Sequence, residues 1–203
     1  MTIRRGEAWG RPGALPADGV VVRSDAEAHD IVTAARRTGA AIPTLGLLGG
    51  DVCRALGGSG DEGRLRSEDA VTFSMDLGEA LLDGRLHYFL AHLVARRRLW
   101  IGRVVVVMNT PWLGEWNLGP KAHPNDGLLD ASDARLRPGE LLPARSRVHL
   151  GTHVPHPRIA TLRAPAMQFG LDRPTTVRLD GRPVGSFRDL SVRVEPDALT
   201  VVV

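Results

Sequence analysis

Most of the chain after Ser67 consists of short apolar runs separated by turn-forming residues, and this pattern constrains the fold more than any other feature. Asp-Gly pairs at residues 83–84, 126–127 and 180–181, and a Pro-Asp pair at residues 196–197, mark turns between many of these runs. Short strands that recur with such turns are typical of a β-sandwich. We expect strands at Val71–Leu77, Leu86–Val94, Gly102–Met108, Leu128–Ser132, Arg158–Arg163, Ala166–Leu171, Thr176–Leu179, Leu190–Val194 and Ala198–Val203.

The first third of the chain shows strands that alternate with helices. The apolar run at residues 20–22 is of the kind that is buried in a parallel sheet. A helix is expected directly after it, because Ser24 and Glu27 form a capping box. A second strand at Ile42–Leu48 and a short helix at Asp51–Leu56 complete one strand–helix–strand–helix unit.

A loop rich in glycine and charge, Gly57–Ser67, is the clearest linker in the chain. The sequence therefore predicts a fold of the α/β plus all-β class, in two parts. Residues 1–67 form an α/β portion that suits part of a doubly wound sheet, and residues 68–203 form a β-sandwich. Only Pro138–Ala144 suggests a helical turn within the second part.

Composition indicates an ordinary globular protein with 43% apolar and 24% charged residues. The single Cys53 excludes an internal disulfide and favours a reducing compartment. The longest strongly apolar run, Val104–Met108, is too short to cross a bilayer, and the N-terminus does not read as a signal peptide. We therefore expect a cytoplasmic protein without a transmembrane segment. The basic residues are scattered and aromatic residues make up only 4%, so we expect no nucleic-acid partner.

Two stretches of the second part share an order of motifs with a known family. Val104–Asp130 runs from a strand through Asn109, spaced glycines and Pro120 to an acidic turn, and Leu179–Arg182 carries a further Asp-Gly turn. From about Asp76 to Val203 the chain resembles the C-terminal half of the diacylglycerol kinases and bacterial lipid kinases, which share their fold with NAD kinases.

This resemblance implies a truncated member of that family, because its members begin with additional strand–helix units. It implies a sandwich whose last strand returns to the first portion. It also implies ATP and Mg²⁺ as cofactors, a lipid substrate or ligand at the membrane surface, and a homodimer.

The family binds nucleotide phosphates on a GGDGT turn, and the equivalent turn here departs from that pattern. Only Asp25 is retained, Arg23 and Ser24 replace glycines, and Glu27 brings a carboxylate that would repel a phosphate. Two interpretations stay open: a plain capped helix start, or Arg23 as a substitute phosphate anchor.

A second family turn, GTxND, is similar to Gly49-Gly50-Asp51. Gly49 and Gly50 could cradle an anion, with Asp51 binding a ribose hydroxyl or a magnesium-bound water. The alternative is that Asp51 caps the following helix and the glycines only make the turn.

The acidic turn Asn125-Asp126-Gly127 resembles the loop that holds a structural magnesium ion in the lipid kinases. Carboxylate and carbonyl oxygens are the ligands that Mg²⁺ prefers, so Asn125 and Asp126 are candidate ligands. Asp-Gly is also a common turn pair without any ion.

The DGE turn of the family, which is tied to catalysis, corresponds to Asp180-Gly181-Arg182. Asp180 is the remaining candidate base, and Arg182 puts the opposite charge where the family has glutamate. An arginine beside Asp180 would make it a weaker base. His149, His153 and His156 invite a zinc interpretation, but Pro155 and Pro157 interrupt the spacing and favour loop histidines.

Two classes of function remain open. The first is an ATP-dependent lipid kinase that is weak or inactive because its nucleotide site is degenerate. The alternative is a non-catalytic module that binds a lipid or nucleotide and acts with a partner.

Overall fold

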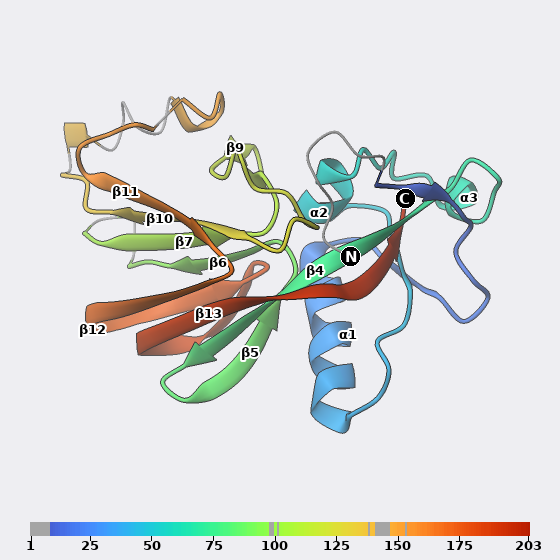
Figure 1. The fold of residues 1–203 in the computed structure, drawn as a ribbon, viewed down its shortest axis with the longest axis horizontal. Coiled ribbons are helices and arrows are strands. Elements are labelled where there is room, and N and C mark those ends of the chain that lie inside the picture. Colours follow the sequence, from blue (N-terminus) through green and yellow to red (C-terminus); the bar gives the residue numbers. More distant parts are fainter. Residues whose placement is uncertain (1–8, 98–99, 101, 138, 141–146, 153) are drawn as a thin grey trace.

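The computed structural model describes residues 9–97, 100, 102–137, 139–140, 147–152 and 154–203. The N-terminal part contributes β1 (Arg11–Pro12), β2 (Val20–Val22), α1 (Asp25–Thr38), β3 (Leu45–Leu47), α2 (Gly50–Ala55) and α3 (Glu62–Leu65). The remainder contributes β4 (Val71–Leu82), β5 (Arg85–Phe89), β6 (His92–Ala95), β7 (Val104–Met108), β8 (Trp112–Leu113), β9 (Trp116–Asn117), β10 (Leu129–Ala134), β11 (Ile159–Ala164), β12 (Ala166–Leu179) and β13 (Arg182–Val202). Figure 1 shows the helices on one side and the sandwich strands on the other, with β4 and β13 running through both.

The predicted fold class is confirmed: an α/β portion is followed by a β-sandwich. One large sheet carries both parts in the order β1-β4-β13-β12-β6-β7-β10-β11, with β5 beside β4 and β2 beside β3. The end of β13 returns to the first part, where Val201 pairs in parallel with Leu45 of β3. No helix in the described part of the chain is long and apolar enough to cross a membrane.

Helix α1 forms where the capping pattern predicts it. Ser24 is the N-cap, and its side chain accepts a hydrogen bond from the Glu27 amide at 3.2 Å. Gly39 ends the helix in the left-handed conformation with φ of 71°, which a residue with a Cβ adopts only at a cost. Val32 lies on the buried face of α1 and is fully excluded from solvent.

Strand β4 joins the two hydrophobic cores because neighbouring side chains point to opposite faces of a sheet. Met75 and Leu77 belong to the core beneath α1 and α2, whereas Ala80 and Leu82 belong to the sandwich core. Gly78 lies between these pairs, and a Cβ at this position would come within 2.3 Å of the Phe89 ring. Glycine is therefore required here for the sandwich core to close.

Three strand predictions need correction. The single strand expected at Leu86–Val94 is broken into β5 and β6 by residues 90 and 91. The two strands expected after Leu190 form one strand, β13, with an irregularity between Glu195 and Leu199. The two strands expected at residues 166–179 are also one, β12, which is irregular after Gly170. Long bulged strands look like separate short ones in the sequence, because the bulge interrupts the alternation of side chains. Most of the helical turn expected at Pro138–Ala144 lies outside the described residues.

Candidate functional site

Five titratable side chains meet where the α/β portion contacts the sandwich, and we call this group the junction cluster. Its members come from α1, α2, β6 and the turn after β12, and all but Asp51 are nearly excluded from solvent. They are Asp25, His29, Asp51, His92 and Asp180.

Asp180 is held by the main chain. It lies with Gly181 in a tight hairpin turn between β12 and β13, both residues having positive φ. Its carboxylate accepts hydrogen bonds from the amides of Leu90 at 2.8 Å, Ala91 at 2.8 Å and His92 at 3.0 Å. These bonds account for the break between β5 and β6, since the amides turn toward Asp180 instead of toward a neighbouring strand.

Asp25 caps the start of α2. Its carboxylate accepts hydrogen bonds from the amides of Asp51 at 2.5 Å and Val52 at 3.1 Å. Gly50 lets this contact form, because a Cβ there would lie 2.4 Å from the Asp25 carboxylate. Burial, followed by the charge of Asp180, raises the pKa of Asp25 to about 6.

Asp51 is the most accessible carboxylate of the cluster, with 13% of its side chain exposed. Both of its oxygens lie 2.9 Å from the Gly114 amide, and His92 Nε2 lies 3.2 Å from Oδ2. Burial alone would raise the pKa of Asp51, but the hydrogen bonds from His92 and Gly114 outweigh it and lower the pKa. Asp51 is therefore ionised at neutral pH.

His92 balances part of the negative charge of the cluster. Burial alone would lower the pKa of His92, but its hydrogen bond to Asp51 and the nearby charge of Asp180 raise it. His29 Nδ1 lies 3.5 Å from the Asp180 carboxylate, which is long for a hydrogen bond. The centre thus holds an Asp51–His92 pair on its open side and Asp180 at its base.

Part of this cluster fits a divalent cation. Asp25, Asp51 and His92 each offer one ligand atom, and these atoms lie within 4.8 Å of one another. Carboxylate and imidazole ligands together suit a first-row transition metal better than Mg²⁺, which prefers oxygen ligands. Among the described residues this is the only such group of three or more.

The predicted phosphate turn does not present free amides to a nucleotide. The Arg23 amide donates to the Glu27 carboxylate at 2.7 Å, and the Arg23 side chain pairs with Glu62 at 3.1 Å. Because Asp25 takes the first amides of α2, the chain's own carboxylates occupy the anion positions of both turns. Gly49 is also confined, since a Cβ there would lie 2.6 Å from the Arg23 carbonyl oxygen. The residues at these turns do not fit the phosphates of ATP.

Arg182 does not pair with Asp180, contrary to the expectation from their adjacency in the sequence. Its guanidinium instead pairs with Asp30 of α1, and both side chains are about half exposed, at 47% and 54%. The amides of residues 90–92 hold the Asp180 carboxylate inside the protein, whereas Arg182 begins β13 at the surface, so adjacency in sequence did not bring these two charges together.

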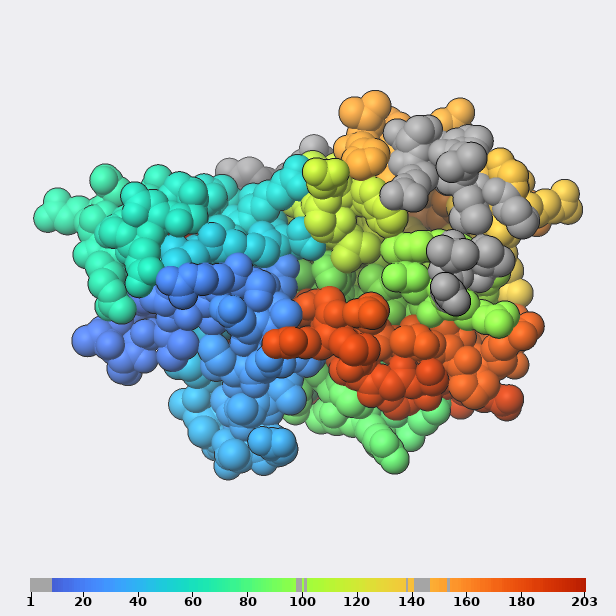
Figure 2. All heavy atoms as spheres, turned by 180° about the vertical axis from the view of Figure 1, so that it is seen from behind, coloured from blue at the N-terminus to red at the C-terminus, as the bar shows by residue number. Residues whose placement is uncertain are grey.

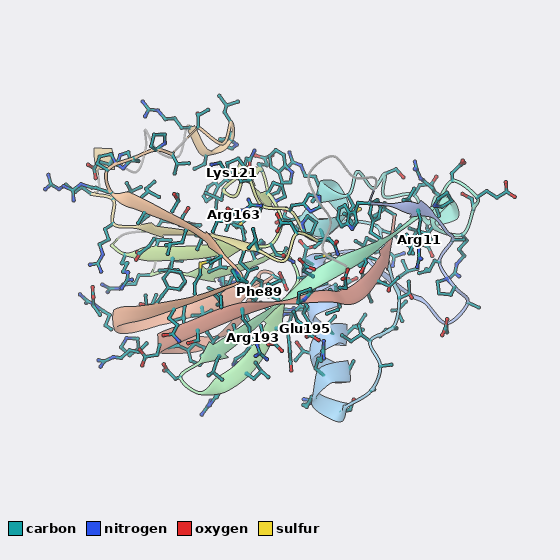
Figure 3. All side chains as sticks on the ribbon, in the orientation of Figure 1. Arg11, Phe89, Lys121, Arg163, Arg193 and Glu195 are labelled. Atoms are coloured by element: carbon teal, nitrogen blue, oxygen red, sulfur yellow. The ribbon has the colours of Figure 1, made fainter. Side chains whose placement is uncertain are left out.

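The turn predicted to hold Mg²⁺ lies apart from the junction cluster, and an arginine occupies its centre. Arg163 on β11 pairs with Asp126 and, at 2.9 Å, with Asp130, and it also donates to the Lys121 carbonyl oxygen. Figure 3 labels Arg163 and Lys121, and the Lys121 main chain supplies the carbonyl oxygen of this contact. We call Asp126, Asp130 and Arg163 the Arg163 cluster. Because the guanidinium already contacts both carboxylates and occupies the position between them, these residues do not fit a bound Mg²⁺.

The neighbouring Asn125 makes a structural hydrogen bond to a distant part of the chain. Its side-chain amide donates to Asp197 at 2.9 Å, whereas its buried Oδ1 has no hydrogen-bond partner among the described residues. Next to it, Asp76 accepts hydrogen bonds from the Gly127 and Asp197 amides at 2.8 and 3.0 Å, and burial raises its pKa to about 6. Asn109 connects this region with the junction, since its amide donates to the carbonyls of Asp76 and Leu90.

A tryptophan-containing hairpin, β8–β9, covers the open side of the junction cluster. Arg54 of α2 donates to the Gly114 carbonyl at 2.8 Å and stacks 3.6 Å above the Trp112 ring. Trp116 packs edge-on against Trp100 with 5.1 Å between ring centroids. Figure 2 shows this yellow-green segment at the surface, beside the cyan segment that contains α2.

Other candidate residues fall into ordinary structural roles. Cys53 is buried in α2, its thiol donates to the Leu47 carbonyl at 3.4 Å, and burial raises its pKa. His156 accepts a hydrogen bond from the Arg158 amide, whereas His153 lies outside the described residues.

The sequence interpretation missed His29, His92, Asp76 and Arg163. A weak signal existed for two of them, because Asp76 is the only charged residue of the expected strand Val71–Leu77 and His92 is the only polar residue of the apolar run Phe89–Val94. No sequence signal identifies the Arg163 partners, which lie 33 and 37 residues away in the chain.

The fold and this arrangement agree with a match to a known family. Residues 69–203 match the family described as the YegS C-terminal NAD kinase beta sandwich-like domain. The match covers more than half of the chain, so the chain belongs to this family, and the resemblance to lipid kinases is confirmed at this level.

Solved structures show the same fold. Two structures from Bacillus anthracis str. Sterne, described as a diacylglycerol kinase, align with TM-scores of 0.70 and 0.65 at 14% sequence identity. The alignments cover 91% of this chain and 77% and 75% of those chains. No curated protein matches the chain.

Proposed function

We propose that this chain is a lipid-binding module with the lipid kinase fold that transfers little or no phosphate. The observation that carries the proposal is that the chain's own carboxylates already bind the backbone amides of the two turns that would face the nucleotide. Glu27 occupies the amide of the first turn and Asp25 occupies the amides of the second. Phosphoryl transfer depends mainly on positioning and neutralising phosphates, so filled anion positions remove its central requirement.

The position of Asp180 supports the same conclusion. A general base needs a free lone pair within hydrogen-bond reach of the proton that it removes. The Asp180 side chain is 0% exposed and already accepts three backbone hydrogen bonds. A lipid hydroxyl could reach it only if β5 and β6 moved apart.

The lipid part of the proposal is supported by the β8–β9 hairpin. Trp100, Trp112 and Trp116 are three of the four tryptophans in the chain, and all three are partly exposed. Tryptophan favours the membrane interface, because its ring is apolar and its N–H needs a polar partner. A hairpin with this composition beside the junction cluster suits contact with a lipid surface.

The turnover part is tested by incubating the protein with labelled ATP, Mg²⁺ and mixed lipids containing diacylglycerol. We expect no phosphatidic acid above background, and calorimetry should give a Kd for Mg·ATP on the order of 1 mM or weaker. Phosphatidic acid production that is abolished by Asp51→Asn would overturn this part.

The lipid part is tested separately by vesicle co-sedimentation. We expect binding to fall at least fivefold in a Trp112→Ala/Trp116→Ala variant, on the order of 1 kcal/mol. Trp9→Phe is the matched control, because Trp9 packs on Phe73 outside the hairpin. Equal binding by all three proteins would remove the hairpin from the proposal.

A weak lipid kinase remains the second candidate, and the accessibility of Asp51 favours it. This carboxylate is ionised, partly exposed and paired with His92, so it could accept a proton or hold a cation near a substrate. The phosphatidic acid assay with Asp51→Asn distinguishes this candidate from the non-catalytic one.

A further inference from the structure

A cavity of about 270 Å³ lies at the end of the sandwich where β6 ends and β7 begins. None of its lining residues belongs to the junction cluster or to the Arg163 cluster. Four arginines from four separate segments line it: Arg97, Arg103, Arg135 and Arg173. Such convergence of like charges is unfavourable unless something negative lies between them.

Two of the four arginines already have acidic partners. Arg103 makes two hydrogen bonds to Asp133, at 2.9 and 2.7 Å, and donates to the Gly170 carbonyl oxygen. It therefore anchors β10 to the irregular part of β12. Arg135 lies 3.4 Å from Asp172, and both side chains are more than half exposed. Because such an exposed ion pair is weak, Arg135 can readily bind another anion in place of Asp172.

The other two arginines have guanidinium groups without a partner among the described residues. The guanidinium groups of Arg97 and Arg173 make no hydrogen bond or ion pair with any residue that the structure describes, and both residues are exposed. After Asp133 and Asp172 are counted against the four arginines, the cavity has two positive charges in excess.

We propose that this cavity binds the phosphate group of a phosphomonoester. A phosphomonoester carries a charge of about −1.5 to −2 at neutral pH, which matches the two excess charges. Guanidinium groups recognise its oxygens with paired hydrogen bonds. A volume of 270 Å³ lies just below the range of pockets that enclose whole small ligands, so the cavity takes the phosphate and leaves the rest of the ligand outside.

The phosphate can belong to a lipid head group or to a soluble molecule, and the aromatic residues beside the cavity favour the lipid. The Trp100 amide donates to the Arg97 carbonyl at 3.3 Å, so Trp100 belongs to the same turn as the cavity residue Arg97. Arg96 lies 4.8 Å above this ring, and the Trp116 ring packs against it at an interplanar angle of 65°. A tryptophan pair beside a phosphate pocket suits a membrane surface, where the rings lie at head-group level. This inference is independent of the proposed lack of turnover.

The test uses the whole chain, with inorganic phosphate and phosphatidic acid vesicles as probes. Titration of inorganic phosphate by NMR or calorimetry should saturate, and Arg97→Ala/Arg173→Ala should weaken it at least tenfold. Arg37→Ala/Arg188→Ala is the matched control, because it removes the same charge from two exposed positions outside the cavity. Thermal unfolding of both double variants establishes that the fold is retained.

Vesicles separate the two sources of phosphate. Vesicles of phosphatidylcholine with phosphatidic acid, which has a phosphomonoester, are compared with charge-matched vesicles containing phosphatidylglycerol, which has only a phosphodiester. Preference for phosphatidic acid that is lost in the cavity variant assigns a lipid head group, and saturable phosphate binding without it assigns a soluble ligand. Absence of both kinds of binding, or equal loss in the control variant, overturns the proposal.

Discussion

Two clusters of carboxylates in the chain balance their negative charge in different ways. In the Arg163 cluster a single guanidinium contacts both Asp126 and Asp130. In the junction cluster no described lysine or arginine forms an ion pair with a carboxylate; the negative charge is balanced by backbone amides and by His92.

This difference separates a fixed region from a responsive one. A guanidinium stays charged at every physiological pH, so Asp126 and Asp130 always face a fixed positive charge, which opposes the rise that burial causes in the pKa of both carboxyls. The junction cluster contains a carboxyl whose pKa is about 6 and a histidine whose pKa is raised, so it gains and loses protons near neutrality. Perturbed groups of this kind gather at functional sites more often than in structural ion pairs.

The largest expected effect is on stability, from Asp180→Ala. The substitution leaves the amides of Leu90, Ala91 and His92 without an acceptor in a buried position. We expect the free energy of unfolding to fall by about 3–5 kcal/mol in urea denaturation. Asp189→Ala, at an exposed position of β13, should change it by less than about 0.5 kcal/mol. Similar losses in both variants would contradict a structural role for Asp180.

The second prediction concerns pH. Asp25 has a pKa of about 6 in the folded protein and 3.8 ordinarily, so the folded state holds its proton more tightly than the unfolded state. This contribution to stability is present at low pH and is lost as pH rises from about 4 to about 7, amounting to about 3 kcal/mol. Asp76, whose pKa is also about 6, and His92, whose pKa is raised, act in the same direction, so Asp25 accounts for part of the total pH dependence.

Urea unfolding at pH 5 and pH 8, with a chelator present, measures about half of this Asp25 contribution, since the rest is lost below pH 5. Asp25→Asn should flatten the dependence while leaving an acceptor for the α2 amides, whereas the exposed Asp18→Asn should not alter it. If the difference in stability between the wild-type protein and the Asp25→Asn variant were the same at pH 8 as at pH 5, Asp25 would not be the titrating group.

The third prediction is that a Mg²⁺ ion can replace the Arg163 guanidinium once that side chain is removed. Arg163→Ala leaves Asp126 and Asp130 without their counter-ion, and we expect a loss of about 1–3 kcal/mol, since the guanidinium is only 32% exposed. Millimolar Mg²⁺ should then raise the Tm of the variant and not that of the wild type. Arg158→Ala, which breaks a similarly exposed pair with Glu140, is the control and should not respond to Mg²⁺.

The fold was largely predictable because its signals are local. The Ser24 cap, the Gly39 stop and the Asp-Gly turns act over a few residues, and each appears where the sequence placed it. The site was predictable only in part. Asp25, Gly49, Gly50 and Asp51 do come together, and Asp180 joins them, but what each carboxylate contacts depends on segments far away in the chain.

The incorrect expectation for Arg182 has the same cause. Its partner Asp30 lies 152 residues away, on a helix whose position over the β12–β13 turn follows from the packing of two cores. Arg163 is a similar case, because β10 and β11 must pair before it can reach Asp126. Ion pairs between distant segments leave no periodic pattern in a sequence.

The smallest expected effect, and the most direct one on function, is from Arg182→Glu, which restores the family's residue. Because the Arg182–Asp30 pair is about half exposed, its replacement by two like charges should lower stability by about 1 kcal/mol or less. Arg182→Ala is the matched control and should lose less stability.

The Arg182→Glu variant also tests catalysis. If Asp180 were a general base that lacked only the neighbouring glutamate of the family, restoring that glutamate could raise lipid kinase activity by up to about 10²–10⁴-fold. We expect no rise, because the Asp180 carboxylate remains committed to three backbone amides and both phosphate turns remain filled. Phosphatidic acid formed by the Arg182→Glu variant and not by the Arg182→Ala variant would show that the junction cluster is a weakened catalytic centre.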